Sequence, residues 1–400
     1  MVRIQHESPM VQLVPLGEPM LLLFASFAAA LHYHLLGVPY AELNENFSSC
    51  AFATKTIRWC RMLNARNASY TVYANSGSDA VCRNVVELFS SAARQSHYGS
   101  DDLIRAGASF DQRTDSPGAL QWIRLASAAI ARRRTGSDLL LAAFGSMHAP
   151  IAAATGLPAV EVGVGYIQTF SRTRIFESHT WLSQIKQQHG SPFSEGDAVV
   201  PMCYFADELH APARRSDVRY LAFVGRVTEN KGIYVALSML QRLPDFRLLI
   251  AGQGDAHTVL SAYPDCADRV EYLGVLPAQQ KNALLAGAVA LIAPTLYNEP
   301  FGSVMVEAQL LGTPVITTDH AGMSSTVWHG VTGFRCRSLR CFLSAAQQAA
   351  RLDRHQIAEI AARAFLCDNV QTRYWDVIDG VAIPGQDCRN GLCSTGSAIN

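Results

Sequence analysis

Two cationic side chains in the second half of the chain stand where a diphosphate could bind. Arg226 and Lys231 lie in GRVTENKG, which begins at Gly225 directly after the apolar run YLAFV. A turn at the carboxyl end of a strand is where α/β proteins bind their ligands. Two cations there can neutralise a diphosphate and stabilise the charge that grows on it as it leaves. Alone, this motif would also fit a solvated lysine at the start of a helix.

A second motif, NEPFGSVMVE, combines two carboxylates with the expected start of a helix. Glu299 and Gly302 precede the helix, and Glu307 lies one to two turns into it. The first amides of a helix have no partner within it and carry partial positive charge, which suits a diphosphate. Gly302 lets the backbone approach a ligand closely, Glu299 could accept hydrogen bonds from sugar hydroxyls, and Glu307 could reach a ribose diol. Two ordinary helix-start glutamates would give the same letters, so the argument depends on both motifs occurring in one unit.

Strand-length apolar runs alternate with helical stretches in both halves of the chain. From residue 31, the expected strands are LHYHLLGV, SYTVYAN, DLLLAAFG and AVEVGVGY, with helices at 51–66 and in HAPIAAATG. From residue 218 the expected strands are VRYLAFVGR, FRLLIAGQG, VEYLGVL, VALIAP and PVITTD. Parallel strands need crossover helices between them, so this rhythm predicts an α/β fold with two Rossmann-like units.

Several segments resemble family 4 glycosyltransferases. They are FVGRVTENKG, LLIAGQGD and NEPFGSVMVEAQLLGTPVITTDHAG, followed by HGVTGF, and the E-x7-E spacing of Glu299 and Glu307 is similar to that family's signature. The resemblance is specific over residues 218–340 and looser over 31–205, where FSSCAFATKTIRWCRML and FESHTW are similar to one subgroup of uncharacterised glycosyltransferases. It implies the GT-B fold, two Rossmann-like domains facing across a cleft, and retaining transfer of a hexose from a nucleotide-diphosphate sugar.

The resemblance also implies roles for individual residues. Arg226 and Lys231 would hold the diphosphate, Glu299 the hexose and Glu307 the ribose. The other donor-binding positions would be Gly225, Phe301, Gly302, Ser303 and Val304. His148 in GSMHAP matches the family's histidine beside the donor sugar, and a histidine that only caps a helix is the alternative.

The acceptor side is less defined, because the Gly-Gly turn of many relatives is missing here. The chain reads GVPYAELNENFSSCAF in that region, which leaves Asn46, Ser48 and Ser49 as the candidates. Gly163 and Gly165 in VEVGVGY are expected to allow close approach in a turn that faces the cleft. The acceptor itself is not determined by the sequence.

No D-x-D motif occurs in the sequence, and such a pair usually holds the metal in enzymes that bind the donor diphosphate through a divalent cation. We therefore expect metal-independent transfer with no cofactor. UDP-glucose is the expected donor and GDP-mannose the next choice. The resemblance implies attack from the same face, with the leaving phosphate accepting the proton of the acceptor.

Composition limits the possible partners. The chain has 33 basic and 33 acidic residues, so charge supports neither nucleic acid nor an anionic membrane as a partner. The 10 cysteines form no C-x-x-C pair, which favours buried thiols and a cytoplasmic protein. Cys388 and Cys393, in a polar tail, could cross-link under oxidation. The apolar run 20–31 is shorter than the roughly 20 residues of a membrane-spanning helix, and its flanks suit an N-terminal extension better than a signal peptide.

These observations predict five segments: an N-terminal extension (1–30), an acceptor-binding Rossmann-like domain (31–205), a nucleotide-sugar-binding Rossmann-like domain (206–365), a helix crossing back to the first domain (366–383) and a disordered tail (384–400). An oxidoreductase is disfavoured because GQGDAH lacks the third glycine of G-x-G-x-x-G. A sugar-nucleotide epimerase, a phosphorylase of similar fold and a non-catalytic nucleotide-sugar-binding protein stay as alternatives.

Overall fold

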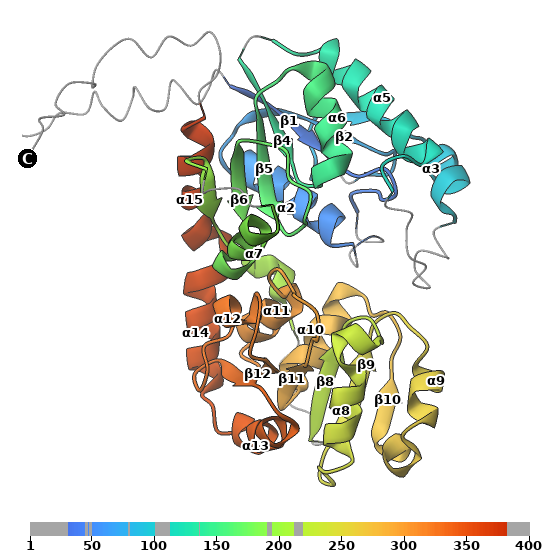
Figure 1. Ribbon diagram of the computed structural model, residues 1–400, viewed down its shortest axis with the longest axis vertical. Coiled ribbons are helices and arrows are strands. Elements are labelled where there is room, and N and C mark those ends of the chain that lie inside the picture. Colours follow the sequence, from blue (N-terminus) through green and yellow to red (C-terminus); the bar gives the residue numbers. More distant parts are fainter. Residues whose placement is uncertain are drawn as a thin grey trace, which may run out of the picture.

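The apolar runs of the sequence form two separate parallel sheets, each covered by helices on both faces (Figure 1). The computed structural model describes residues 31–44, 47, 50–78, 81–100, 113–135, 137–189, 194–211 and 219–381. The expected N-terminal extension and C-terminal tail, with Cys388 and Cys393, lie outside these ranges, as do the acceptor candidates Asn46, Ser48 and Ser49. Within the described ranges, no helix combines the length and the apolar character needed to cross a membrane.

The N-terminal domain is built on a seven-stranded sheet. Its strands are, in sheet order, β3 (Val85–Glu87), β2 (Ser69–Ala74), β1 (His32–Leu36), β4 (Asp138–Ala142), β5 (Ala159–Val164), β6 (Thr173–Phe176) and β7 (Asp197–Val199). The strand order reverses between β1 and β4, which pair with Leu35 opposite Leu141. Ligands of such sheets bind outside the carboxyl ends of the strands at this reversal.

Helices cover this sheet with local signals that the sequence contains. They are α2 (Ala51–Ala65), α3 (Ser91–Tyr98), α5 (Pro117–Ala131), α6 (Gly145–Thr155) and α7 (His179–His189). Ser116 caps α5 by accepting from the amide of Ala119, and Pro117 occupies the first turn. Gly156 ends α6 in the left-handed conformation, as HAPIAAATG predicts.

The C-terminal domain repeats the plan with six strands. In sheet order they are β10 (Val270–Tyr272), β9 (Arg247–Ala251), β8 (Tyr220–Val224), β11 (Ala290–Ala293), β12 (Val315–Thr318) and β13 (Gly333–Cys336). The helices are α8 (Ile233–Leu240), α9 (Ala256–Ser261), α10 (Ala278–Gly287), α11 (Ser303–Leu310), α12 (Met323–Thr326), α13 (Leu339–Ala349) and α14 (Arg354–Phe365), with 3-10 turns η2 (Ala206–Leu209), η3 (Glu229–Lys231) and η4 (Pro264–Arg269). Here the order reverses between β8 and β11, the two strands that precede GRVTENKG and NEPFG.

The chain passes between the domains twice, and the two passages lie together. α14 runs along the C-terminal domain and α15 (Cys367–Asp379) continues along the N-terminal domain (Figure 1), where Tyr374 and Trp375 pack in that domain's core. The amide of Tyr204 donates to the carbonyl of Phe365, and the amide of Cys367 donates to the carbonyl of Tyr204.

A disulfide joins Cys203 to Cys367 at this double passage. The expectation that the cysteines are thiols is therefore wrong for this pair, because two residues 164 positions apart meet only in the folded chain. Cys60, Cys82, Cys266 and Cys336 are buried free thiols, as predicted.

Candidate active site

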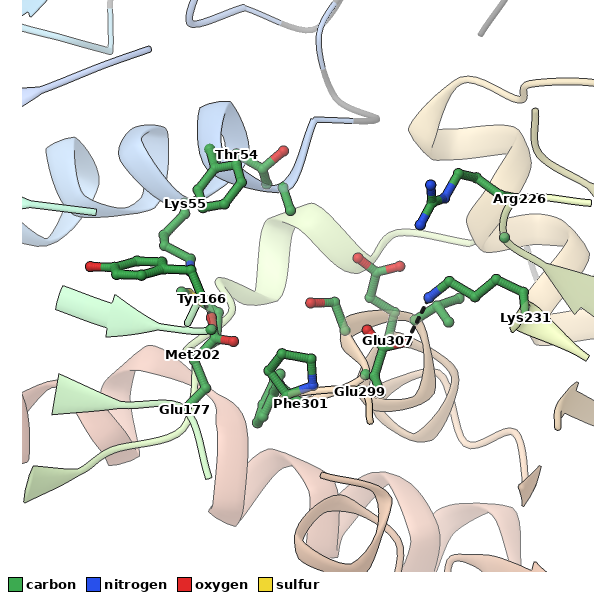
Figure 2. Close-up of a pocket in the computed structure, with 18 of the residues that line it drawn as sticks. Thr54, Lys55, Tyr166, Glu177, Met202, Arg226, Lys231, Glu299, Phe301 and Glu307 are labelled. Atoms are coloured by element: carbon green, nitrogen blue, oxygen red, sulfur yellow. Dashed lines mark hydrogen bonds and ion pairs between the residues drawn. The ribbon is translucent and has the colours of Figure 1, made fainter. Parts of the chain in front are cut away.

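A cavity of about 1100 Å³ lies between the two domains. Its lining includes segments that follow β8 and β11 in one domain and β4 and β5 in the other. Figure 2 shows Arg226, Lys231, Glu299 and Glu307 on one side of the cavity, and Lys55, Tyr166 and Glu177 on the other. The cavity therefore opens at the strand ends where each sheet reverses its order.

The turn after β8 aims two cations at the cavity. Gly225 has φ of 156° and Gly232 has φ of 81°, so glycine suits both ends of this turn. The Lys231 ammonium donates to Glu299 Oε2 at 2.5 Å and to the Tyr297 hydroxyl at 2.9 Å. The guanidinium of Arg226 points into the cavity and makes no hydrogen bond or ion pair within the part of the chain that the structure describes (Figure 2). An anionic ligand could therefore pair with Arg226 without breaking an existing ion pair.

The start of α11 faces the same space. Gly302 has φ of 86°, and a Cβ at this position would run into the end of the Met305 side chain. The first helical hydrogen bond is donated by the Met305 amide to Gly302, so the amides of Ser303 and Val304 precede the helical ladder. Both residues line the cavity, as does the buried residue Phe301.

Glu307 lies further along α11 and is held by a lysine from the neighbouring helix. The Lys281 ammonium of α10 donates to Glu307 Oε2 at 2.6 Å. The same domain also lines the cavity with Gly252, Gln253, Val275 and Leu276, none of which carries a charge.

Tyr297 is a contact that the sequence reasoning missed. Burial, followed by the charge of Glu299, raises the pKa of its phenol well above the usual range. The hydroxyl is therefore protonated at neutral pH and can fix the Lys231 ammonium as an acceptor. Its position two residues before Glu299 is the only sequence signal that pointed to it.

His148 does not reach the cavity. Its ring is fully buried, Nδ1 accepts from the amides of Ala143 and Phe144, and Nε2 bonds the Gly37 carbonyl at 2.9 Å. This arrangement fixes the neutral tautomer with the proton on Nε2, and burial lowers the pKa to about 4. The predicted contact with the donor sugar does not fit this geometry, because Phe144, Gly145 and Ser146 line the cavity in its place.

The structure brings together all the predicted residues of the C-terminal domain. Those on the cavity lining are Gly225, Arg226, Lys231, Glu299, Phe301, Gly302, Ser303, Val304 and Glu307. Lys55, Glu177, Tyr297 and Lys281 also line it and were not singled out from the sequence. Among the described residues, no group of three or more His, Cys, Asp or Glu side chains is placed to hold a metal ion.

Solved structures with this architecture define the fold as GT-B. Sucrose-phosphate synthase from Thermosynechococcus elongatus superimposes with a TM-score of 0.69 at 15% identity, covering 87% of this chain and 98% of that one. Anabaena Alr3699/HepE, in complex with UDP and glucose, superimposes with a TM-score of 0.61 at 15% identity, covering 88% and 99%. The predicted fold class is confirmed.

The C-terminal domain matches a known family at the level of sequence. The family model of glycosyl transferases group 1 covers residues 206–339. D-inositol 3-phosphate glycosyltransferase of Mycobacterium sp. (strain KMS) is 37% identical over 121 residues, 28% of this chain and 27% of that protein. Glycogen synthase of Mycobacterium tuberculosis (strain H37Rv) is 34% identical over 158 residues, 36% of each. The matched segments thus span about a quarter to a third of these curated relatives. The range of the family model contains the turn after β8 and the start of α11.

Proposed function

We propose that this chain is a retaining glycosyltransferase of the family 4 type, which transfers a hexose from a nucleotide-diphosphate sugar to an acceptor hydroxyl. One observation carries the proposal: Arg226, Lys231 and the amides of Ser303 and Val304 line a single cavity between two Rossmann-like domains. The two cations and the helix start come from the loops that follow β8 and β11, on either side of the strand-order reversal.

The donor we propose is UDP-glucose, with GDP-mannose as the alternative. Apart from Glu299 and Glu307, the described lining residues of the C-terminal domain include no carboxylate. Guanine presents N–H and NH₂ donors that a carboxylate would satisfy, whereas uracil is served by one backbone donor and one acceptor. The neutral surface of Gln253, Val275 and Leu276 therefore favours uridine.

Each contact with the donor would follow from the groups present. Arg226, Lys231 and the first amides of α11 would bind the diphosphate, and Glu307, positioned by Lys281, would accept from the ribose hydroxyls. Glu299, held by Lys231, would accept from hydroxyls of the hexose. The same cations would stabilise the negative charge that develops on the leaving phosphate, and this supports transfer without a metal.

Retention would then require the acceptor to approach from the face that the leaving phosphate occupies. The phosphate oxygen would accept the proton of the acceptor hydroxyl as the new glycosidic bond forms. The two domains already touch beside this point, since the Ser178 hydroxyl donates to the Pro300 carbonyl at 2.6 Å. Closure there would exclude water, which competes with the acceptor.

The test is transfer from UDP-glucose in EDTA, with UDP release measured and the anomeric configuration of the product read by NMR. We expect the α-configuration of the donor to be kept and Lys231→Ala to lose transfer. Epimerised UDP-sugar without UDP release would indicate an epimerase, phosphate-dependent release of glucose 1-phosphate a phosphorylase, and UDP-glucose binding without turnover a binding protein. An inverted product or a requirement for a divalent cation would contradict the mechanism.

A further inference from the structure

The N-terminal wall of the cavity contains an ion pair that the donor contacts above do not use. The Lys55 ammonium of α2 lies 2.8 Å from Glu177 Oε1, which follows β6. The side chains are 7% and 11% exposed, and both residues line the cavity. Lys55 Nζ also donates to the Gly163 carbonyl at 2.5 Å. The pair is therefore fixed in position and lies at the surface of the cavity.

Two glycines at the end of β5 make room for this pair. A Cβ on Gly163 would lie 3.0 Å from Cδ of Lys55, and φ of 61° at this residue also favours glycine. A Cβ on Gly165 would overlap Glu177 Oε2. The close approach expected at the two glycines of VEVGVGY is therefore found: Gly163 lies against Lys55, and Gly165 lies against Glu177.

The pair lies beside the loop that we assign to the transferred hexose. The same Cβ on Gly165 would lie 3.4 Å from Cβ of Pro300, which follows Glu299. Ser178, next to Glu177, donates to the carbonyl of Pro300. Glu177 is therefore the N-terminal carboxylate that borders the reacting end of the donor site, where an acceptor hydroxyl must enter.

Apart from one further ion pair, the rest of the described part of this wall is uncharged. Its aromatic and aliphatic members are Phe52, Phe144, Tyr166, Ile167 and Trp181. The other cation on the described part of the wall is Arg58, and Glu208 Oε2 neutralises it at 2.7 Å. A phosphorylated acceptor would find no uncompensated cation among these side chains, whereas the apolar face of a sugar ring or an aromatic ring would find rings to pack on.

We propose that Glu177, positioned by Lys55, binds a hydroxyl of the acceptor, and that the acceptor is an uncharged, hydroxyl-bearing molecule with an apolar face, such as a glycoside or a phenol. This rests on the proposed function and specifies its second substrate. Glu177 accepts the hydrogen bond of a hydroxyl on the acceptor, while the ion pair with Lys55 holds the carboxylate in position in the wall.

Calorimetry on the full chain saturated with UDP tests this without knowledge of the donor sugar. The probes are 4-nitrophenyl β-D-glucopyranoside and glucose 6-phosphate. We expect the neutral glycoside to bind at least about tenfold more tightly than the phosphate, and Glu177→Gln to weaken it by about tenfold or more, because a neutral amide accepts a weaker hydrogen bond than a carboxylate. UDP affinity should change less than about twofold.

Two further variants separate binding from folding. Glu177→Gln leaves Lys55 without its partner. The double variant Lys55→Met with Glu177→Gln removes both charges and should therefore fold. Its affinity for the glycoside should be as low as that of Glu177→Gln. Asp197→Asn is the matched control, because the Asp197 side chain is 1% exposed and paired with Arg174 and Lys186, and Asp197 is not among the residues that line the cavity.

The inference is overturned if glucose 6-phosphate binds more tightly than the glycoside, if the glycoside does not bind, or if both Glu177 variants keep its affinity. It is also overturned if Asp197→Asn weakens the glycoside as much as they do. Failure of the wild-type protein to bind UDP is a different result, because it contradicts the proposed function itself.

Discussion

Each of the two walls of the cavity presents a Lys–Glu ion pair, but the two walls are built in different ways. On the C-terminal wall, Arg226 and Lys231 belong to the turn after β8, and Glu299 and Gly302 to the loop after β11, the neighbouring strand of the sheet. On the N-terminal wall, Lys55 comes from α2, Tyr166 from the segment after β5 and Glu177 from the segment after β6. The first wall is built from contiguous motifs, and the second from residues that only the packed sheet brings together.

This difference has a physical cause. A diphosphate is a fixed chemical group that cations and free amides bind in a standard way, and both can be supplied by a short turn and a helix start. Acceptors differ in shape and polarity, so their wall is assembled from side chains on several elements. We therefore expect substitutions on the C-terminal wall to affect any donor-dependent reaction, and those on the N-terminal wall to affect the choice of acceptor.

The largest expected effect is loss of either member of the Lys231–Glu299 pair. Lys231→Ala and Glu299→Ala should each reduce transfer by about 10³-fold or more, because each removes a donor contact and leaves the other charge without its partner at 2.5 Å. Steady-state kinetics with UDP-glucose measures this. Glu359→Gln, in an exposed ion pair with Arg363, is the control and should keep the wild-type rate. Wild-type rates in either alanine variant would contradict the role of this wall.

Gly302→Ala should have the next largest effect. The new Cβ would overlap the end of Met305 and strain a backbone with φ of 86°, which costs about 1–2 kcal/mol and displaces the first amides of α11. UDP affinity should fall by about tenfold or more, measured by calorimetry.

Gly330→Ala provides a matched comparison for that variant. Gly330 has φ of 78°, and a Cβ there would meet nothing within 4 Å. Its substitution carries similar backbone strain away from the cavity lining, so stability should fall while UDP affinity is kept. Equal losses of UDP affinity in both variants would mean that strain, and not the position of α11, is responsible.

On the N-terminal side, His148 should influence stability and not transfer. Its pKa is about 4 in the folded protein because of burial, against 6.5 in a model compound. The unfolded chain therefore binds more protons between these values, and the free energy of unfolding should fall as the pH drops from about 6.5 to 4. Between pH 7.5 and pH 5 the loss from this residue is about 2 kcal/mol.

Urea unfolding at these two pH values checks the His148 prediction. His148→Gln can still donate to Gly37 but does not titrate, so it should remove that part of the pH dependence and keep transfer within a few-fold. If His148→Gln were as stable as the wild type and yet lacked transfer, His148 would have a role in the active site after all.

The smallest effect is expected where the walls meet. Ser178→Ala removes the hydrogen bond to the Pro300 carbonyl, a loss of about 1 kcal/mol. The KM for donor should rise by a few-fold, and the free energy of unfolding should fall by about 1 kcal/mol, because Ser178 also caps α7 by accepting from the Trp181 amide. Ser183→Ala, which removes a hydroxyl that donates to the His179 carbonyl within α7, should leave KM unchanged. Identical kinetics in the two variants would mean that this contact does not help the domains to close.

The sequence predicted one wall well and the other poorly, for the same physical reason. The rhythm of strands and the motifs around Arg226 and Glu299 gave the fold class and the lining of the C-terminal wall, because each motif is local. The sequence reasoning missed the Lys55–Glu177 pair, since Lys55 of α2 and Glu177 after β6 are 122 positions apart and become neighbours only in the folded domain. His148 was misplaced because a helix-start histidine can turn toward the cavity or toward the core, and the letters are identical in both cases. The disulfide between Cys203 and Cys367 likewise depends on the double passage of the chain.

The most direct test of the account compares UDP with uridine by calorimetry in EDTA, using the wild type and Arg226→Ala. Arg226 is the cavity cation that has no partner within the described chain, and its role is to pair with the diphosphate. The account predicts that the wild type binds UDP about 100-fold more tightly than uridine, and that Arg226→Ala loses most of this difference while its affinity for uridine stays the same. Equal affinities for UDP and uridine in the wild type, or an unchanged preference in Arg226→Ala, would contradict it.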